Sequence, residues 1–373
     1  MQFQNDLELT LILMETIQFK ADRKEEDLFA KELSKNVRTY FKDKGITSQG
    51  DYRMVIKAIM MIGIYLAPIT LILTVDMPAW MVIILLVIMG VGEAGIGMGV
   101  MHDAVHGSFS KYNWLNKLMG NTMFLLGSNV INWKLQHNLF HHTYTNLYGW
   151  DGDIESKGLL RLAKKAEQKK VYRYQYLFGP LLYGLMTLSK FFGDFGQLRD
   201  FHKRGALEVY GINYKNSMLF LVITKVIYLG VFFAMPILFT DFTWWQILLG
   251  FLIMHITASI IMGTVFQMAH VVEEVKQPQV DKPGVVHHNH QVHMLHTTSD
   301  FYKKGGLLSW YIGGLDYQVE HHLFPNVSHL FYPDLAVIVK DTASKYNLPY
   351  HSHSSFIEAL KSHLSMLKKL GRQ

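Results

Sequence analysis

Histidines are the side chains of this sequence best suited to chemistry, and many of them gather in short clusters. The chain has 19 His and no Cys in 373 residues. Three clusters stand out: His102-Asp103-Ala104-Val105-His106, His137-Asn138-Leu139-Phe140-His141-His142 and Gln318-Val319-Glu320-His321-His322. Residues four apart lie on one face of an α-helix, so the two imidazoles of the first cluster point the same way. In the second cluster, His137 and His141 share a face, and His142 lies about 100° round the helix.

One such pair would indicate little, because an isolated His near a membrane surface is more often a hydrogen-bonded residue than a ligand. Three clusters, all at the ends of apolar segments, together predict a metal site. A further candidate is the His that ends the stretch Phe266-Gln267-Met268-Ala269-His270. The predicted ligands are therefore His102, His106, His137, His141, His142, His270, His321 and His322.

The number and type of these ligands narrow the choice of metal. Eight imidazoles are more than one four-coordinate zinc needs, so two ions are expected. Imidazole suits Zn, Cu, Fe and Ni, and the chain has no thiolate that would select a softer ion. A two-zinc hydrolase would usually include carboxylate ligands. A nitrogen-rich set beside long apolar helices favours chemistry on an unactivated hydrocarbon, for which iron with O₂ is the usual agent.

The elements that must position these clusters are membrane helices. Half of the chain is apolar and 18% is charged, against about 25% in a typical soluble domain. Residues 55–75, 79–101, 216–240 and 243–270 are each long and apolar enough to cross a hydrocarbon core of about 30 Å. The links after the first and third segments are very short, so the four spans form two helical hairpins. We expect an all-α integral membrane protein with a helical cap that holds a His-rich di-iron site.

Two hairpins return the chain to its starting side, which gives the expected topology. Residues 1–54, the loop 102–215 and everything after residue 270 share one face. Nearly all Lys and Arg lie in these parts, which predicts a cytoplasmic face for the cap. The net charge of +6 is therefore a topology signal and predicts no nucleic-acid partner. We divide the chain into an N-terminal segment 1–54, a catalytic domain 55–330 and a tail 331–373, and expect no cleaved signal peptide.

Two further apolar stretches, residues 118–133 and 172–195, are too short or too polar for spans and are expected to be interfacial helices. If one of them crossed the membrane, the His clusters would lie on opposite faces. Within the spans, Glu93 and Lys225 lie at similar depths and could pair, or Lys225 could snorkel to the headgroups. His255 is expected to be a hydrogen-bonded residue between helices, or to line the far end of a substrate tunnel.

The three clusters resemble the histidine boxes of the membrane-bound fatty acid desaturases. Gln318-Val319-Glu320-His321-His322-Leu323-Phe324-Pro325 is similar to the third box of the front-end branch, whose members insert a double bond between an existing one and the carboxyl end. The stretch His141-His142-Thr143-Tyr144-Thr145-Asn146, followed by Asp151-Gly152-Asp153-Ile154, is similar to the same branch. The resemblance implies a fatty acyl substrate, carried by coenzyme A, acyl carrier protein or a lipid. It also implies two iron ions held by the eight His, O₂ and two electrons.

The resemblance also assigns roles to neighbours of the ligands. Gln318 stands where other branches have a ligating His, and it would bind metal weakly, through water, or not at all. The residues expected to support the ligands are Asp103, Asn146, Asp151 and Asp153. A further run, residues 287–296, contains five His that are expected to have surface or supporting roles, with His296 the best candidate for a contact near the active site.

One departure from many front-end relatives concerns the electron supply. The chain has no His-Pro-Gly-Gly, and residues 1–54 are too few for a cytochrome b5-type domain, so a separate ferredoxin or cytochrome b5-type donor is expected. Lys164, Lys165, Lys169 and Lys170 would dock an acidic donor or face lipid headgroups, and the sequence does not choose between the two.

Two other functions compete with a desaturase. Alkane, sterol and carotenoid hydroxylases use similar His clusters. A His-rich metal transporter is the second alternative, but transporters hold their ligands near the bilayer midplane, whereas these clusters lie at the ends of spans.

Overall fold

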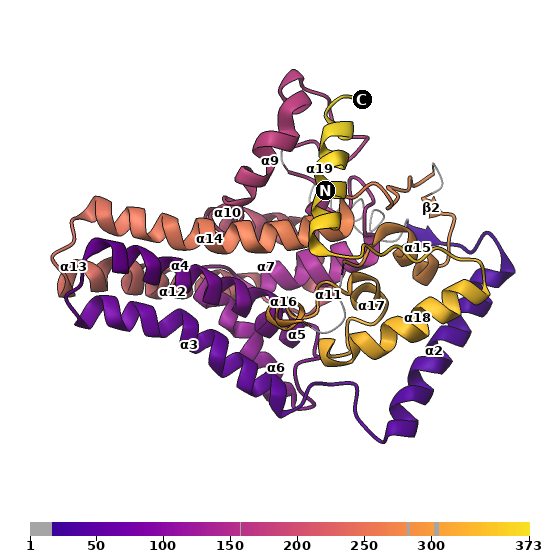
Figure 1. The fold of residues 1–373 in the computed structure, drawn as a ribbon, viewed down its shortest axis with the longest axis horizontal. Helices are drawn as coiled ribbons and strands as arrows, with labels where there is room; N and C mark the ends of the chain where they lie inside the picture. The colour runs from indigo at the N-terminus through magenta and orange to yellow at the C-terminus, as the bar shows by residue number, and fades with distance from the viewer. Residues whose placement is uncertain (1–16, 157, 282–283, 302–305) are drawn as a thin grey trace.

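A computed structural model describes residues 17–156, 158–281, 284–301 and 306–373. The first 16 residues of the predicted N-terminal segment lie outside the described residues. Regular structure in the described part is almost entirely helical (Figure 1). The exception is one short parallel pair, β1 (Gln18–Phe19) with β2 (Val285–Val286). The predicted all-α class is confirmed.

Four helical segments of the described residues are long and apolar enough to cross a membrane. Their bounds are Tyr52–Thr74, Ala79–Val105, Tyr214–Phe239 and Trp244–His270, which agree with the predicted spans to within a few residues. The first and last are the single helices α3 and α14. The second consists of α4 (Ala79–Ile96), the π-helix η1 (Gly97–Met101) and α5 (His102–Val105). The third consists of α12 (Tyr214–Leu229), the π-helix η6 (Gly230–Ala234) and α13 (Met235–Phe239).

Local signals in the sequence set the ends of these helices. The Asp51 side chain accepts the Arg53 N–H at the start of α3, and Thr243 and Gln246 form a capping box at the start of α14. Short links then force each pair of spans into a hairpin, as predicted. α4 also packs against α14, and at Gly90 an added Cβ would lie 2.6 Å from the Met254 carbonyl oxygen. Glycine is therefore required where these two backbones approach each other.

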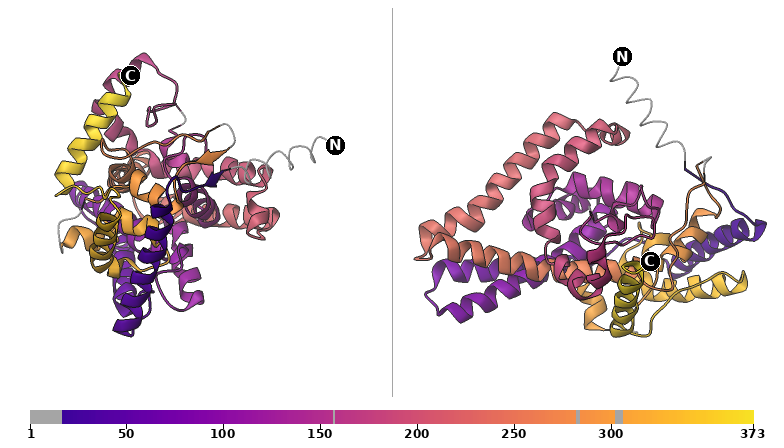
Figure 2. Two further views of the ribbon diagram at one scale, coloured as in Figure 1. Left: turned by 90° about the vertical axis from the view of Figure 1, so that its right-hand side faces the viewer. Right: turned by 90° about the horizontal axis from the view of Figure 1, so that it is seen from above.

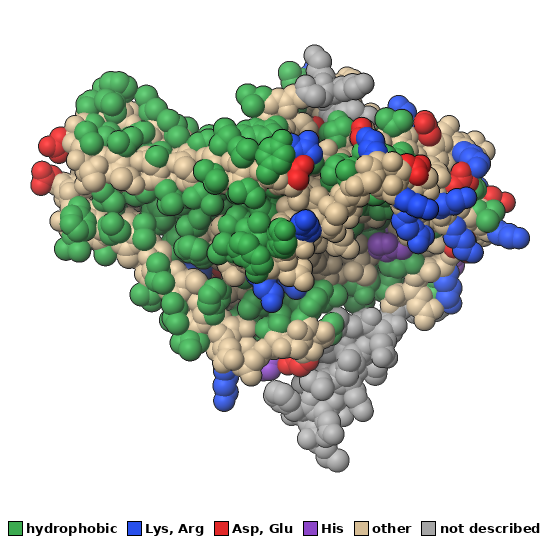
Figure 3. Space-filling view, turned by 90° about the horizontal axis from the view of Figure 1, so that it is seen from below, with side chains coloured by type: hydrophobic (Ala, Val, Ile, Leu, Met, Phe, Trp, Pro, Cys, Tyr) green, Lys and Arg blue, Asp and Glu red, His purple; other side chains and the backbone are tan. Residues whose placement is uncertain are grey.

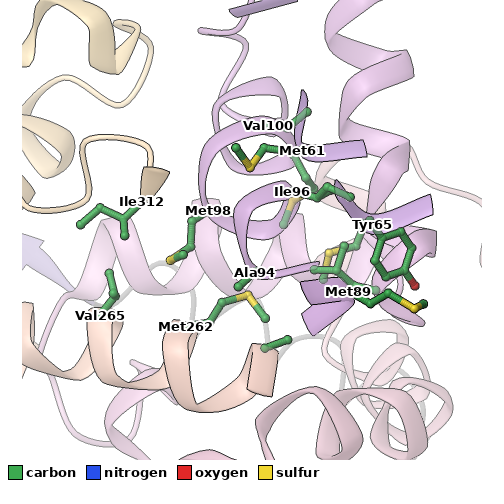
Figure 4. Packing of buried hydrophobic residues seen from close by; sticks show 14 of the residues in the cluster. Met61, Tyr65, Met89, Ala94, Ile96, Met98, Val100, Met262, Val265 and Ile312 are labelled. Carbon is green, nitrogen blue, oxygen red and sulfur yellow. The ribbon is translucent and has the colours of Figure 1, made fainter. Parts of the chain in front are cut away.

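The core of the span bundle is rich in methionine and has few polar groups. Met61, Met89, Met98 and Met262 are buried there with smaller apolar side chains from α3, α4 and α14 (Figure 4). Methionine is unbranched and flexible, so it fills irregular space between helices that small residues bring close together. The bundle therefore presents a largely apolar interior next to the histidines, in which Glu93, Lys225 and His255 are buried polar exceptions.

The described residues outside the spans form one cap at the end of the bundle where the His clusters lie (Figures 1 and 2). We use the term cap for residues 17–51, 106–213 and 271–373. Its longer helices are α2 (Lys24–Lys44), α10 (Met186–Lys203), α18 (Tyr332–Lys345) and α19 (Phe356–Leu370). Green apolar side chains cover the bundle in the space-filling view, whereas charged side chains gather over the cap (Figure 3). This contrast agrees with an integral membrane protein whose cap lies in water.

Residues 118–133 and 172–195, the two further apolar stretches of the sequence, do not form spans. Residues 118–133 are divided among α6 (Asn113–Gly120), the 3₁₀-helix η2 (Asn121–Leu126) and α7 (Val130–Lys134). Residues 172–195 begin in the 3₁₀-helix η5 (Lys170–Tyr174), continue through α9 (Gln175–Tyr183), and break at Gly184 before α10. All three His clusters can therefore lie on one side of the membrane.

The charged residues inside the spans do not pair as the sequence suggested. The proposed Glu93–Lys225 pair is wrong, because Lys225 Nζ lies 2.8 Å from Asp194 Oδ2 on α10 and Glu93 lies 3.4 Å from His255 Nδ1. Lys225 is 6% exposed, so it does not snorkel either. His255 is a hydrogen-bonded residue between helices, as expected: its Nδ1 lies 2.8 Å from Thr187 Oγ1 and its Nε2 2.9 Å from the hydroxyl of Tyr228.

Candidate metal centre and active site

The first His cluster is carried by the end of the second span. The α-helix α4 widens into the π-helix η1 one turn before His102 and then returns to α-helical geometry in α5. π-helical turns are rare and occur frequently at functional sites. The rings of His102 and His106 lie 4.9 Å apart and are both buried, so they point into the same space as predicted.

The second cluster lies on another π-helix, η3 (Leu135–His141), and this changes the predicted arrangement. His137 and His141 stack at 5.2 Å, as expected, but His142 does not lie about 100° away from them. Its ring is 4.6 Å from that of His137. A π-helix closes hydrogen bonds from i to i+5, so its wider turn keeps both later rings on the side of His137. The spacing of residues alone could not show this.

The third cluster forms the short helix α17 (Gln318–Leu323), which follows a tight glycine turn. Gly313 and Gly314 both have positive φ, of 73° and 67°. A Cβ at Gly314 would also lie 2.7 Å from the His329 Cβ, so this turn accepts only glycine. The turn holds α17 against the ends of the second and fourth spans, where His321 and His322 meet the other clusters.

The structure brings all eight predicted ligands together from four parts of the chain. Possible ligand atoms lie within 4.8 Å of one another in overlapping groups: His102, His106, His137 and His321; His141, His270 and His322; and His142, His321 and His322. The fourth span contributes His270, whose ring is 4.7 Å from both His141 and His322. Two groups of nitrogen atoms joined by a third fit two neighbouring metal ions better than one.

The ring nitrogens themselves test whether a metal fits. The Nδ1 of His321 lies 3.2 Å from the Tyr332 hydroxyl, and the Nδ1 of His322 lies 3.2 Å from Thr145 Oγ1. The Nε2 atoms of both rings are buried and have no hydrogen-bond partner among the described residues. Metal-bound imidazoles usually give the outer N–H to a protein acceptor and leave the inner nitrogen for the metal, so these donors fit a bound cation.

Burial keeps most of these imidazoles in the neutral form that binds metal. Burial, with the neighbouring imidazoles, holds the pKa values of His106, His137, His142, His321 and His322 well below the ordinary value of 6.5. His141 is the exception. Burial lowers its pKa, but the carboxylates of Asp151 and Asp153 outweigh burial and raise it to about 9. A metal at this ring must therefore displace a proton.

Four residues expected to support the ligands are all close to them. Asp151 Oδ1 lies 3.0 Å and Asp153 Oδ2 3.4 Å from His141 Nδ1, and Asp103 Oδ1 lies 3.7 Å from His102 Nδ1. Asn146 acts through the backbone: its side chain donates to the carbonyl oxygens of His270 and two other residues. The loop after the second box is thereby fixed to the end of the fourth span.

The prediction for His296 is not supported by its contacts. Its ring packs on His288 at 4.6 Å instead of on a box histidine, because the helix α15 (His290–Thr297) turns this face toward α2. His293 takes the expected role, since its Nε2 lies 2.8 Å from the Thr145 carbonyl oxygen. Gln318 is 2% exposed, and its side chain lies next to the His270 imidazole.

Several residues near the site could not be found from the sequence. His329 lies 2.8 Å from Asp103 through Nδ1 and 3.2 Å from the buried Lys57 ammonium through Nε2. Trp133 stacks on His137 at 4.2 Å. His329 begins the short 3₁₀-helix η7 (His329–Phe331), seven residues after the third box, and no spacing to the box histidines marks it. Its contacts with Lys57 and Asp103 connect α3 to the first box, although the three residues are far apart in the sequence.

A cavity of about 210 Å³ opens beside the histidines on the cap. It is lined by His142, Thr143, His290, Gln291, Met294, His322, Leu323 and Pro325. Two of the candidate ligands therefore form part of its wall. A small molecule that enters from the cap would meet the metal ligands directly.

Comparison with known proteins shows to which family a chain with this buried histidine cluster belongs. A family model described as fatty acid desaturase matches residues 78–354, which include all three boxes. The chain belongs to the fatty acid desaturase family. It is an integral membrane oxidoreductase that acts on fatty acyl chains, and its buried histidine cluster is a metal site.

Named relatives cover nearly the whole chain. The sn-1 linoleoyl-lipid 6-desaturase of Arthrospira platensis is 28% identical over 92% of this chain and 92% of its own length. The acyl-lipid (8-3)-desaturase of Mortierella alpina is 31% identical over 93% of this chain and 78% of its own length. The expected family is therefore confirmed, and the alternatives of a hydroxylase and a metal transporter are set aside.

Proposed function

We propose that this desaturase is a front-end fatty acyl desaturase whose two iron ions are held by the eight buried histidines. The observation that carries the metal assignment is the set of buried ring nitrogens within 4.8 Å of one another, among which the Nε2 atoms of His106, His321 and His322 have no hydrogen-bond partner in the described part of the chain. The front-end assignment is supported by Gln318 at the start of the third box and by the names of the relatives. Those relatives act at position 6 of a linoleoyl lipid or are acyl-lipid (8-3)-desaturases.

Iron suits this site because its ligands are imidazoles and because the reaction must remove hydrogen from a methylene. Bound iron with O₂ and two electrons supplies that oxidising power, which no amino-acid side chain has. The protein's own part is to hold the ligands and the acyl chain. Asp151 and Asp153 orient His141, Tyr332 orients His321, and the apolar interior of the bundle excludes water from the acyl tail.

Position within the chain decides which carbons react, because methylenes differ little in intrinsic reactivity. The methionine-rich interior between α3, α4 and α14 begins directly below the histidines, so the tail would lie there. We propose that a separate protein of the ferredoxin or cytochrome b5 type delivers the electrons, and that the cap faces the cytoplasm. The second proposal rests on the concentration of Lys and Arg in the cap.

Expression in a host of known lipid composition tests the function. We expect a new double bond between an existing one and the carboxyl end, and two irons per chain after iron supplementation. His321→Ala should abolish both activity and metal binding. The matched control is His287→Ala, because His287 is exposed and its partners are the surface carboxylates of Asp22 and Asp281. One ion per chain, or a double bond toward the methyl end, would contradict the proposal.

Single cysteines test the orientation without background, since the chain has no Cys. Cysteine at Lys111, Arg204 or Lys340 should react from the cytoplasmic side, and cysteine at Asp241 from the opposite side. These four positions are exposed in the structure. Labelling of the first three from different sides would refute the shared face.

A further inference from the structure

The cavity beside the metal ligands has a location that constrains what can occupy it. Its walls come from α8 (His142–Tyr144), α15 and the end of α17, all of which belong to the cap. The spans reach the same histidines from the other side, through His102 and His270. In Figure 1, α15 and α17 lie to the right of the histidine-bearing ends of the spans. The cavity and the apolar bundle are thus on opposite sides of the metal ligands.

The lining of the cavity combines apolar walls with free polar groups. Met294, Leu323 and Pro325 are apolar, whereas Gln291 is a half-buried amide. The Gln291 backbone N–H is already bound by the Asn289 side chain, but within the described part of the chain its side-chain amide has no hydrogen-bond partner. An amide can donate two hydrogen bonds and accept others, so this group is available to a ligand.

The His290 side chain is less available to a ligand than that of Gln291. Its ring lies against the backbone of His142 and Thr143, at the end of the second box. It therefore closes one wall of the cavity and fixes the position of α15 relative to the ligands. Gln291 and Thr143 are the two half-buried polar side chains of this cavity that have no side-chain hydrogen bond among the described residues, and the Gln291 amide offers the larger number of donors.

We propose that the carboxyl end of the acyl substrate occupies this cavity, with its ester or thioester carbonyl oxygen accepting a hydrogen bond from the Gln291 amide. The inference rests on the proposed front-end function and extends it. The acyl chain then passes the metal ligands and continues into the apolar bundle. Gln291 anchors the polar end, so it fixes how many carbons separate the carbonyl group from the metals.

The size of the cavity agrees with a front-end position. A cavity of 210 Å³ is about 7 Å across if it is nearly spherical, and an extended chain advances about 1.2 Å per bond, or 3.6 Å over three bonds. About six bonds therefore span it. A carbonyl group at the far wall would place roughly the fifth to seventh carbon beside His142 and His322. A substrate anchored here by its carboxyl end cannot present carbons near its methyl end.

The test uses Gln291→Leu, which keeps the side-chain size and removes the donor. We expect the KM for the acyl substrate to rise about 3- to 10-fold, as for the loss of one hydrogen bond. We also expect products with displaced double bonds, while the iron content stays unchanged. The matched control is Gln49→Leu, a cap glutamine that makes a hydrogen bond with Ser48 away from the cavity. Linoleoyl-CoA and a linoleoyl phospholipid in vesicles are compared to distinguish the two carriers.

A second measurement does not depend on turnover. In Gln291→Cys the protein has a single thiol, because the chain has no Cys. Saturating acyl substrate, without electron donor, should slow maleimide labelling at this thiol and leave Gln49→Cys unaffected.

Three results would overturn the inference. The first is unchanged KM and product positions in Gln291→Leu, and the second is labelling that acyl substrate does not slow. The third is a higher KM for the electron donor alone, which would assign the cavity to donor docking. A wild-type product desaturated toward the methyl end would instead refute the proposed function, so the two failures are distinguishable.

Discussion

Asp151 offers the sharpest test of how the metal ligands are held. Its carboxylate is fully buried, lies 3.0 Å from His141 Nδ1 and also accepts the Asn146 backbone N–H at 2.8 Å. Asp151→Asn keeps the shape and an acceptor oxygen but removes the charge. Asp153→Asn is the matched control, because Asp153 lies farther from the ring, at 3.4 Å, and its side chain is 33% exposed.

The structure sets the size of the effect. The pKa of His141 lies at about 9 against 6.5 for an ordinary His, and each pH unit corresponds to about 1.36 kcal/mol, so the surroundings stabilise the protonated ring by about 3 kcal/mol. This is the net effect and not the share of Asp151 alone, since Asp153 adds to it and burial opposes it. Loss of a supporting hydrogen bond of this kind typically lowers the metal affinity about 10- to 100-fold. We expect a loss in that range for Asp151→Asn and a smaller one for Asp153→Asn.

Metal retention during titration with a chelator measures the loss, and fatty-acid analysis of the product measures activity in the same preparations. Unchanged far-UV circular dichroism shows that the helices persist. The reasoning would be refuted if Asp151→Asn retained iron as well as the wild type, or if the exposed Asp153 mattered more than Asp151.

Three further predictions concern buried charges and the third box. Lys225→Met should destabilise the protein by about 3–5 kcal/mol because it leaves the buried Asp194 carboxylate without its cation. The double variant Lys225→Met/Asp194→Leu should regain much of the lost stability, as measured by thermal unfolding. Burial raises the pKa of Asp300 to about 7, so the folded protein binds an extra proton between about pH 4 and 7 and its stability falls as pH rises through this range; Asp300→Asn should flatten the dependence of the unfolding temperature on pH, and an unchanged slope would be inconsistent with this origin. Gln318→Ala should lower activity about 10- to 100-fold because His270 loses the polar side chain that lies next to it, whereas Gln318→His should retain metal. Full activity of Gln318→Ala at unchanged iron content would exclude this role.

The sequence predicted the spans and the box histidines well, because both depend on short-range patterns. Hydropathy over about 20 residues places a span within a few residues, and the i, i+4 pairs carry over directly to His102 and His106. The sequence did not predict side-chain contacts in which the two partners come from distant segments of the chain. Lys225 pairs with Asp194 because α10 packs beside α12, and His329 reaches Asp103 from the 3₁₀-helix η7, more than 200 residues further along the chain.

Local backbone geometry was the other source of error. A helical wheel with 3.6 residues per turn put His142 away from His137, and the π-helix η3 brings the two rings within 4.6 Å. Nothing in the residue types of this segment distinguishes a π-helical turn from an α-helical one. The errors at Lys225 and His142 thus have separate causes, long-range packing in one case and backbone hydrogen bonding in the other.

Two π-helices, η1 directly before the first box and η3 within the second, also bear on how the enzyme matures. A π-helical segment gives up the more favourable i to i+4 hydrogen bonds, so η1 and η3 are the parts of their helices most ready to rearrange. These two segments set the positions of the first two boxes in the structure. We therefore expect membrane insertion and helix packing to precede a late closing step, in which the cation itself selects the π-helical register and locks it. Loading of metal is then the last act of folding, and amide hydrogen exchange at residues 135–141 should slow sharply when it occurs.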